Sequence, residues 1–176
     1  FGKLRNPDRA DPSQEEGGSA GESESLMQVS APIMDAAGAI VAGFGLIIRP
    51  ESEFTRILSV ARSGQTGETF AFDRSGLLIS QSRFEDQLRK LGLLGTRGGQ
   101  SSALNIELRD PGENLLDLLK IDTPPSTWPL TRMVKDAVEG GVGVDVEGFR
   151  DYRGVRVVGA WQWLPRYGFG VATKVD

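Results

Sequence analysis

Apolar and polar residues alternate with a period of two towards the end of the chain, which is the pattern of half-buried β-strands. One face of the first such strand carries Val155, Val157, Trp161 and Trp163, and one face of the next carries Phe169, Val171, Thr173 and Val175. The short stretch 165–168 between them contains Pro and Gly, which favours a turn. We therefore expect these two strands to pair antiparallel.

A second pattern, Asp-x-x-Gly between apolar runs, occurs three times. It covers residues 35–38, 73–76 and 151–154. An Asp at the first position of a turn accepts a hydrogen bond from the backbone two residues on, and Gly at the fourth position tolerates unusual dihedrals. The pattern predicts three hairpins, with strand pairs at 26–34 and 39–48, 68–72 and 77–80, and 144–150 and 155–164.

Helical periodicity appears between the hairpins. In segment 50–62 the apolar residues Phe54, Ile57, Leu58 and Ala61 follow the i, i+3, i+4, i+7 spacing of one helix face. Segment 129–139 has the same spacing and is followed by Gly140, which favours a helix end there. Shorter helical turns are expected at 84–91 and 113–120.

Together these elements predict an α+β fold, a PAS-like five-stranded antiparallel sheet flanked by short helices, with an extra N-terminal hairpin. The chain divides into a flexible arm or loop at 1–25, a hairpin at 26–48, a connecting helix at 49–63 and the PAS-like module at 64–176. The arm is assigned from composition, because it is rich in Gly, Ser, Pro and acidic residues with little to bury.

Composition narrows the classes of function. The net charge of -4 comes from 20 basic and 24 acidic residues without a long block of either sign, so nucleic acid is not an expected partner. The chain has no Cys and no His, which excludes thiol and imidazole catalysis and most zinc sites. We expect no enzyme activity and no cofactor or metal.

Three stretches resemble the Cache family of bacterial receptors. Residues 30–48, SAPIMDAAGAIVAGFGLII, resemble the last hairpin of a membrane-distal Cache module. Residues 63–84, SGQTGETFAFDRSGLLISQSRF, resemble the opening of the next module, and residues 152–176, YRGVRVVGAWQWLPRYGFGVATKVD, resemble its closing strands. Their order matches the C-terminal part of a double Cache segment, which in this family is a periplasmic sensor ahead of a kinase, cyclase or chemotaxis domain.

The resemblance has two exceptions. The long helix and full distal module that would open a double Cache segment are not visible before Leu26. The family's amino-acid-binding cluster of Tyr, Arg, Trp and Asp has no counterpart in this chain, so amino-acid sensing is not implied. Any membrane contact is expected through segments outside this sequence.

A PAS-like sensor holds its ligand between the sheet and the helices and loops that cross it. The predicted ligand-binding residues, all on strands or turn edges of the module, are Phe70, Phe72, Ser80, Arg83, Tyr152, Arg153 and Trp161. All of them except Ser80 also have a plainer interpretation. The aromatic residues Phe70, Phe72 and Trp161 are also typical core, Arg83 is also typical of a solvated strand end, and Tyr152 and Arg153 lie in a turn where exposure is normal.

The leading hypothesis is an extracytoplasmic sensor domain that binds an unknown small molecule and passes a conformational change to the membrane. The alternative is a spacer or dimerisation module of such a receptor that binds nothing, and a homodimer is compatible with both. An enclosed cavity with converging polar groups favours the sensor, whereas a fully packed core favours the spacer.

Overall fold

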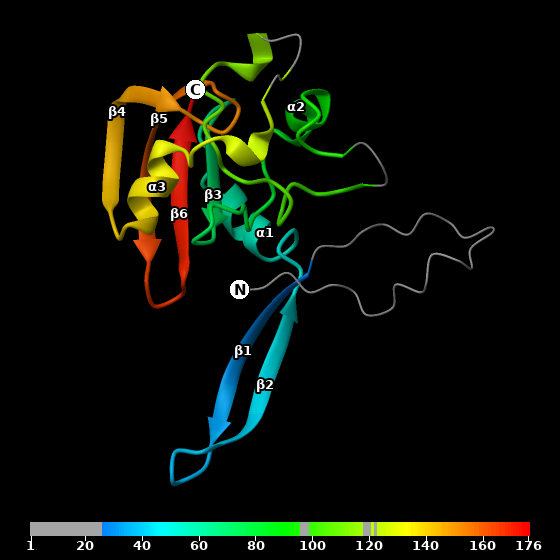
Figure 1. Cartoon of the computed structure of the whole chain (residues 1–176), viewed down its shortest axis with the longest axis vertical. Helices are drawn as coiled ribbons and strands as arrows, with labels where there is room; N and C mark the ends of the chain where they lie inside the picture. The colour runs from blue at the N-terminus through cyan, green and yellow to red at the C-terminus, as the bar shows by residue number, and fades with distance from the viewer. Residues whose placement is uncertain (1–25, 96–98, 118–120, 122) are drawn as a thin grey trace, which may run out of the picture.

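The structure is a computed structural model that describes residues 26–95, 99–117, 121 and 123–176. The strands form two separate antiparallel sheets, one of two strands and one of four (Figure 1). No helix in the described part of the chain is long and apolar enough to cross a bilayer. The arm predicted at 1–25 lies outside the described residues.

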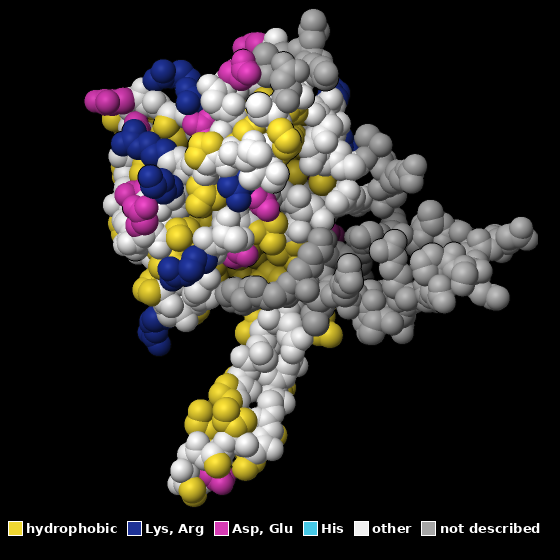
Figure 2. All heavy atoms as spheres, in the orientation of Figure 1, with side chains coloured by type: hydrophobic (Ala, Val, Ile, Leu, Met, Phe, Trp, Pro, Cys, Tyr) yellow, Lys and Arg dark blue, Asp and Glu magenta, His cyan; other side chains and the backbone are white. Residues whose placement is uncertain are grey.

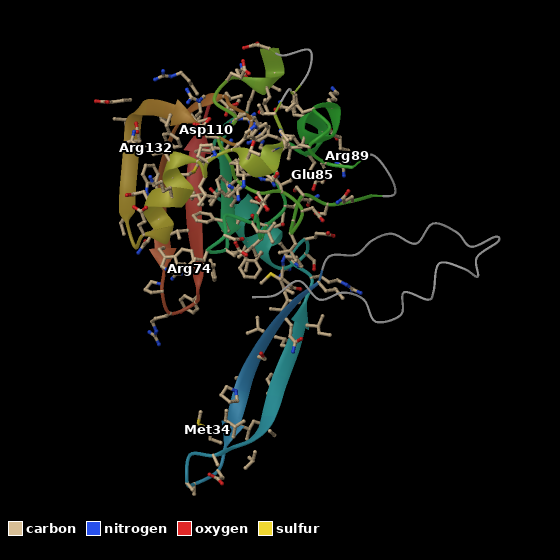
Figure 3. The ribbon with its side chains drawn as sticks, viewed as in Figure 1. Met34, Arg74, Glu85, Arg89, Asp110 and Arg132 are labelled. Carbon is tan, nitrogen blue, oxygen red and sulfur yellow. The ribbon has the colours of Figure 1, made fainter. Side chains whose placement is uncertain are left out.

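The two-stranded sheet is the predicted N-terminal hairpin. Strand β1 (Met27–Met34) pairs with β2 (Ile40–Ile48), and the hairpin projects away from the rest of the molecule (Figure 1). Every residue from Gln28 to Ile47 is exposed, including large apolar side chains such as Phe44 at 61%. Hydrophobic side chains are visible along this projecting hairpin in Figure 2, and Met34 lies near its tip (Figure 3).

The four-stranded sheet has the order β3-β6-β5-β4. Its strands are β3 (Glu68–Phe72), β4 (Val142–Arg150), β5 (Arg156–Leu164) and β6 (Phe169–Val175). All three strand pairs are antiparallel. The last strand of the chain, β6, therefore lies inside the sheet between β3 and β5.

One of the five predicted strands of the module, at 77–80, is only partly formed. Leu78 bridges Phe72 of β3, and Leu77 bridges Glu107 on its other side. Its backbone divides its hydrogen bonds between β3 and the loop around Ile106, so no regular ladder develops. The segment still lies beside β3. If the strands of the module are numbered along the chain from β3, with 77–80 as the second, their order across the sheet is second, first, fifth, fourth and third, which is a PAS-like arrangement.

The helices are short. They are α1 (Phe54–Ser59), α2 (Glu85–Lys90) and α3 (Arg132–Val138), with 3₁₀ turns at Leu115–Asp117 and Pro125–Thr127. The first is only half as long as the predicted 50–62. Residues 50–53 form turns, because Ser52 and Glu53 both donate their backbone N–H to the Arg49 carbonyl, and no side chain caps the helix start.

The core lies on both faces of the four-stranded sheet. The larger cluster fills the face towards α3, called here the inner face, and includes Phe70, Phe72, Met133, Val134 and Trp161. A smaller cluster lies on the outer face, where Phe54 and Leu58 of α1 pack with Met27, Ala71, Ile79 and Leu104. Helix α1 covers only the β3 side of the outer face.

The two faces of β6 are buried to different extents. Phe169, Val171, Thr173 and Val175 do share a face, but this face is the less buried one. The buried face carries Gly170, Ala172 and Lys174. Small residues are needed there because a Cβ at Gly170 would lie 2.4 Å from the Phe72 ring. Lys174 is buried because it is paired, as described below.

All three Asp-x-x-Gly turns form as predicted. In each, one carboxylate oxygen of the Asp accepts hydrogen bonds from the backbone N–H groups two and four residues on. The glycines Gly38, Gly76 and Gly154 have φ of 83°, 85° and 76°, which is left-handed backbone that suits Gly.

Candidate functional site

The turn between β4 and β5 is packed under a loop, and its side chains are buried. A Cβ at Gly154 would lie 1.7 Å from the Glu113 carbonyl oxygen, and the Leu115 N–H donates to the Arg153 carbonyl at 3.0 Å. Tyr152 and Arg153 are 2% and 1% exposed. The expectation of an exposed turn is therefore wrong, because segment 113–115 covers it.

These buried residues belong to a group of five charged side chains and one tyrosine at one end of the sheet. We call it the buried ion cluster, and its members are Glu68, Asp151, Tyr152, Arg153, Lys174 and Asp176. Asp151 lies at its centre. One carboxylate oxygen of Asp151 accepts from Lys174 Nζ at 2.7 Å and from Arg153 Nε at 2.9 Å, while the other closes the turn.

The second carboxylate of the cluster, Glu68, lies at the start of β3 and is 1% exposed. Tyr152 Oη lies 3.0 and 2.9 Å from its two oxygens. Ser82 Oγ and the Arg83 backbone N–H donate to Glu68 Oε1 at 2.8 and 2.9 Å, and Lys174 Nζ lies 3.2 Å from Oε2. Glu68 thus joins β3, the 82–83 segment, the Asp151 turn and β6.

The two cations of the cluster also contact one aromatic ring. The Arg153 guanidinium carbon lies 3.6 Å from the centroid of the Phe84 ring, and Lys174 Nζ lies 4.6 Å from it. Cation–π contacts of this kind gain strength when the cation is desolvated. Arg153 also reaches helix α2 through Gln87 Oε1 at 3.0 Å and the end of β6 through Asp176 Oδ1 at 2.5 Å.

Burial and neighbouring charge shift two pKa values in the cluster. Burial, followed by the charge of Glu68, raises the pKa of Tyr152 well above its ordinary value, so the phenol stays protonated and donates. Burial acts to lower the pKa of Arg153, but the charge of Asp151 and the bond to Asp176 outweigh it and raise that pKa. Removing one partner would strand the others in a low-dielectric site.

A cavity of about 240 Å³ adjoins the cluster. Tyr152 lines it together with Gly92, Leu93, Asn105, Ile106, Glu107, Arg109, Pro125, Ser126 and Trp128. Arg109 is held at its edge by Glu107 and by the Trp128 carbonyl at 2.7 Å. A larger cavity, of about 690 Å³, lies between the hairpin and α1, and none of the seven predicted site residues lines it.

The seven predicted residues fall into three groups. Phe70, Phe72 and Trp161 are core on the inner face. Ser80 is buried and accepts from the Ala71 N–H, and Arg83 donates to the carbonyls of Gly64 and Gly67 at 3.1 and 2.7 Å, so it holds the loop before β3. Tyr152 and Arg153 form part of the ion cluster, and Tyr152 also reaches the 240 Å³ cavity.

Sequence reasoning missed Glu68, Ser82 and Lys174. The strand alternation places Lys174 in phase with Gly170 and Ala172, whereas the large apolar residues of β6 lie on the other phase and give the stronger periodic signal. Glu68 and Ser82 are close to Lys174 only through the β3–β6 pairing and the Asp151 turn. No local pattern in the sequence marks either residue.

Within the described residues, no group of three or more acidic side chains is arranged to hold a metal ion. The carboxylates of the cluster are bound to Lys, Arg, Tyr and backbone N–H groups instead. This arrangement can couple the ends of several elements to one another, because Glu68 of β3, Arg153 of the turn and Lys174 of β6 are joined through Asp151, Tyr152 and Gln87 of α2.

No protein-family model and no curated protein matches the chain. Among solved structures, the extracellular domain of the "putative histidine kinase mmHK1S-Z3" has a TM-score of 0.49 at 18% identity, over 86% of this chain and 44% of that one. The extracellular domain of the "putative histidine kinase mmHK1S-Z2" has a TM-score of 0.44 at 16% identity, over 86% and 45%. The chain therefore spans less than half the length of either structure.

Proposed function

We propose that the chain is an extracytoplasmic sensor domain of a bacterial transmembrane receptor, in which the module at 64–176 binds a small molecule and transmits its occupancy through β6. One observation carries the proposal: the terminal residues of a central strand are bound into a buried ion cluster that also borders a cavity. The Cache resemblance supports the periplasmic, inner-membrane setting and the assignment of 26–48 to the end of a distal module.

Contacts lead from the cavity to the output strand in two steps. Tyr152 lines the cavity and donates to Glu68, and Glu68 pairs with Lys174 of β6. A ligand that displaces the Tyr152 ring therefore changes the environment of the Lys174 ammonium. Such a ligand shifts a signalling equilibrium only to the extent that it binds one arrangement of these groups better than another.

The cavity limits the ligand class. Its volume of about 240 Å³ is below the roughly 300–1,000 Å³ of drug-sized pockets, so it suits a small metabolite. Leu93, Ile106 and Trp128 offer an apolar wall, and Asn105, Glu107 and Arg109 offer polar groups of both signs. We infer a small molecule with one apolar side and one polar or zwitterionic end.

A spacer module is the second candidate, and the ion cluster itself favours it. Asp151, Glu68 and Lys174 already satisfy one another, and the inner face is filled by aromatic side chains. A module of this kind holds β6 in place without a ligand. The two candidates assign no catalytic step to the chain and differ in whether the cavity is occupied.

Ligand binding can be tested by thermal shift and by tryptophan fluorescence, to which Trp128 in the cavity wall contributes, with a panel of small carboxylic acids, amines, polyols and nucleobases. A compound at about 100 times its dissociation constant should stabilise the fold by about 2.7 kcal/mol. Leu93→Phe, which fills the cavity, should abolish the response. Leu116→Phe, at a 45% exposed position outside the cavity, should retain it.

Two results would count against the sensor. If no compound in the panel moves either signal, the spacer is the better description. If a compound binds Leu93→Phe as tightly as the wild type, the 240 Å³ cavity is not the ligand site.

A further inference from the structure

The sheet ends at β4, whose outer edge is open. No strand of the described residues pairs with β4 on the side away from β5 (Figure 1). Val142, Val144 and Val146 are 71%, 73% and 77% exposed and alternate along this edge strand. Open edges in soluble proteins are protected by Lys or Pro, by bulges or by inward-pointing charges. Segment 142–146 carries no Lys or Pro, its inward-pointing Asp145 is paired with Arg132, and the bulge of β4 begins only after Asp145.

The free backbone groups of β4 alternate in a known phase. The Trp163 N–H donates to the Gly141 carbonyl, and the next residue, Val142, lies opposite Gln162 in the β4–β5 register. Hydrogen-bonded and non-hydrogen-bonded pairs alternate in an antiparallel ladder. Val142 and Val144 therefore direct their N–H and C=O groups away from β5, towards the open edge.

The edge is also free of unbalanced charge. The charged residue within 142–146, Asp145, is 5% exposed and lies on the inner face, where Arg132 of α3 pairs with it. Arg132 lies beside β4 in Figure 3. Asp145 also accepts from the N–H groups of Glu147 and Gly148, at the bulge that interrupts the β4–β5 pairing between Asp145 and Phe149.

We propose that this edge binds a second copy of the chain, with β4 pairing antiparallel to β4 of the partner about a two-fold axis at Val144. The segment Val-Gly-Val-Asp-Val is close to symmetric about that residue. The axis places Val142 opposite the partner's Val146 and Val144 opposite its own copy, and the outward backbone groups then meet as hydrogen-bonded pairs. Antiparallel partners share a face, so the valines of both copies form one stripe.

Neighbouring positions for the axis are worse. An axis at Asp145 places two carboxylates opposite each other, which is destabilising in a cross-strand pair. An axis at Gly143 leaves Val146 without a valine partner. Of these three positions, only the axis at Val144 gives every valine a valine partner. It also places Asp145 opposite Gly143.

The proposed β4–β4 interface is small, so we expect the dimer to be weak. Five paired residues in each copy form an interface well below the roughly 1,600 Å² of a standard stable complex, so dimerisation in solution requires high protein concentration. Anchoring two copies in one membrane would raise the effective concentration towards the millimolar range. Only this last step rests on the proposed receptor function; the pairing itself does not.

Single cysteines test the register without background, because the chain contains no Cys. Val144→Cys should form a disulfide-linked dimer under mild oxidation, since opposite residues of a strand pair lie within the roughly 4.4–6.8 Å that a disulfide spans. Val142→Cys alone should not, because two such residues lie about 13 Å apart along the paired strands. A mixture of Val142→Cys and Val146→Cys protein should form the cross-link again.

Sedimentation of the cysteine-free protein over about 10 µM to 1 mM provides the second readout. Val144→Lys should abolish the concentration-dependent dimer, and Ile57→Lys, at a 69% exposed apolar position on α1, should leave it unchanged. Equal cross-linking of Val142→Cys and Val144→Cys would overturn the register. Cross-linking of Phe44→Cys in place of Val144→Cys would move the contact to the hairpin and overturn the proposal, whether or not a ligand is ever found.

Discussion

The turns at Asp35 and Asp151 have the same backbone geometry and opposite surroundings. In both, the Asp carboxylate accepts from the N–H groups two and four residues on, and the Gly has a φ near 80°. The Asp35 turn is exposed at the end of a projecting hairpin. The Asp151 turn is buried, and the second oxygen of its Asp binds Lys174 and Arg153.

The difference shows what the motif determines and what it leaves open. Asp-x-x-Gly determines the turn, because its hydrogen bonds are local. The surroundings depend on the side chains of the two central residues of the turn. Ala36 and Ala37 have no polar side-chain atoms. Tyr152 donates to Glu68, and Arg153 donates to Gln87 and Asp176. One motif thus forms a plain hairpin end in one place and the centre of the candidate site in the other.

The largest predicted effect comes from removing the shared carboxylate. Asp151→Ala takes the partner from two buried cations as well as two turn hydrogen bonds, so we expect a loss of about 3–5 kcal/mol in the free energy of unfolding. Asp35→Ala removes only the turn hydrogen bonds, at about 0.5–1.5 kcal/mol. Urea unfolding followed by tryptophan fluorescence measures both, since Trp161 and Trp163 lie in the core. Equal losses would show that burial adds nothing to the second turn.

The next prediction concerns the Tyr152 hydroxyl. Tyr152→Phe leaves Glu68 with Ser82, the Arg83 N–H and Lys174, so we expect a moderate loss of about 1–2 kcal/mol near neutral pH. Tyr167→Phe is the matched control, because Tyr167 is 62% exposed and the chain has no third tyrosine.

This loss should depend on pH in a defined direction. Burial and the charge of Glu68 raise the pKa of Tyr152, so the folded protein keeps a proton that the unfolded chain releases near pH 10. The stabilisation is complete below that pH and falls above it by up to about 1.4 kcal/mol per pH unit. The difference in the free energy of unfolding between the wild type and Tyr152→Phe, measured by urea unfolding, should therefore disappear between about pH 10 and 11. A constant difference across this range would contradict the raised pKa.

Local signals in the sequence predicted the fold well and the site poorly. The three turns and the pairing of consecutive strands follow from short patterns such as Asp-x-x-Gly and period-two alternation, and they formed as expected except that 77–80 is only partly formed. Lys174 was missed because a buried lysine is costly unless a carboxylate from elsewhere in the chain reaches it. Its partners Glu68 and Asp151 are 106 and 23 positions away in sequence (174 less 68, and 174 less 151), and only the sheet brings them together.

The smallest predicted effect comes from the hairpin face. Phe44 lies opposite Ala31 in the β1–β2 register and is 61% exposed, so Phe44→Ala removes little buried surface. We expect a change within about 0.5 kcal/mol in the same urea assay, which is the usual range for surface substitutions. Phe70 is fully buried, and Phe70→Ala as a reference should cost about 3–5 kcal/mol. If Phe44→Ala approached that value, another surface would cover the hairpin in solution, and the contrast between the two turns would reflect partner binding rather than the fold of one chain.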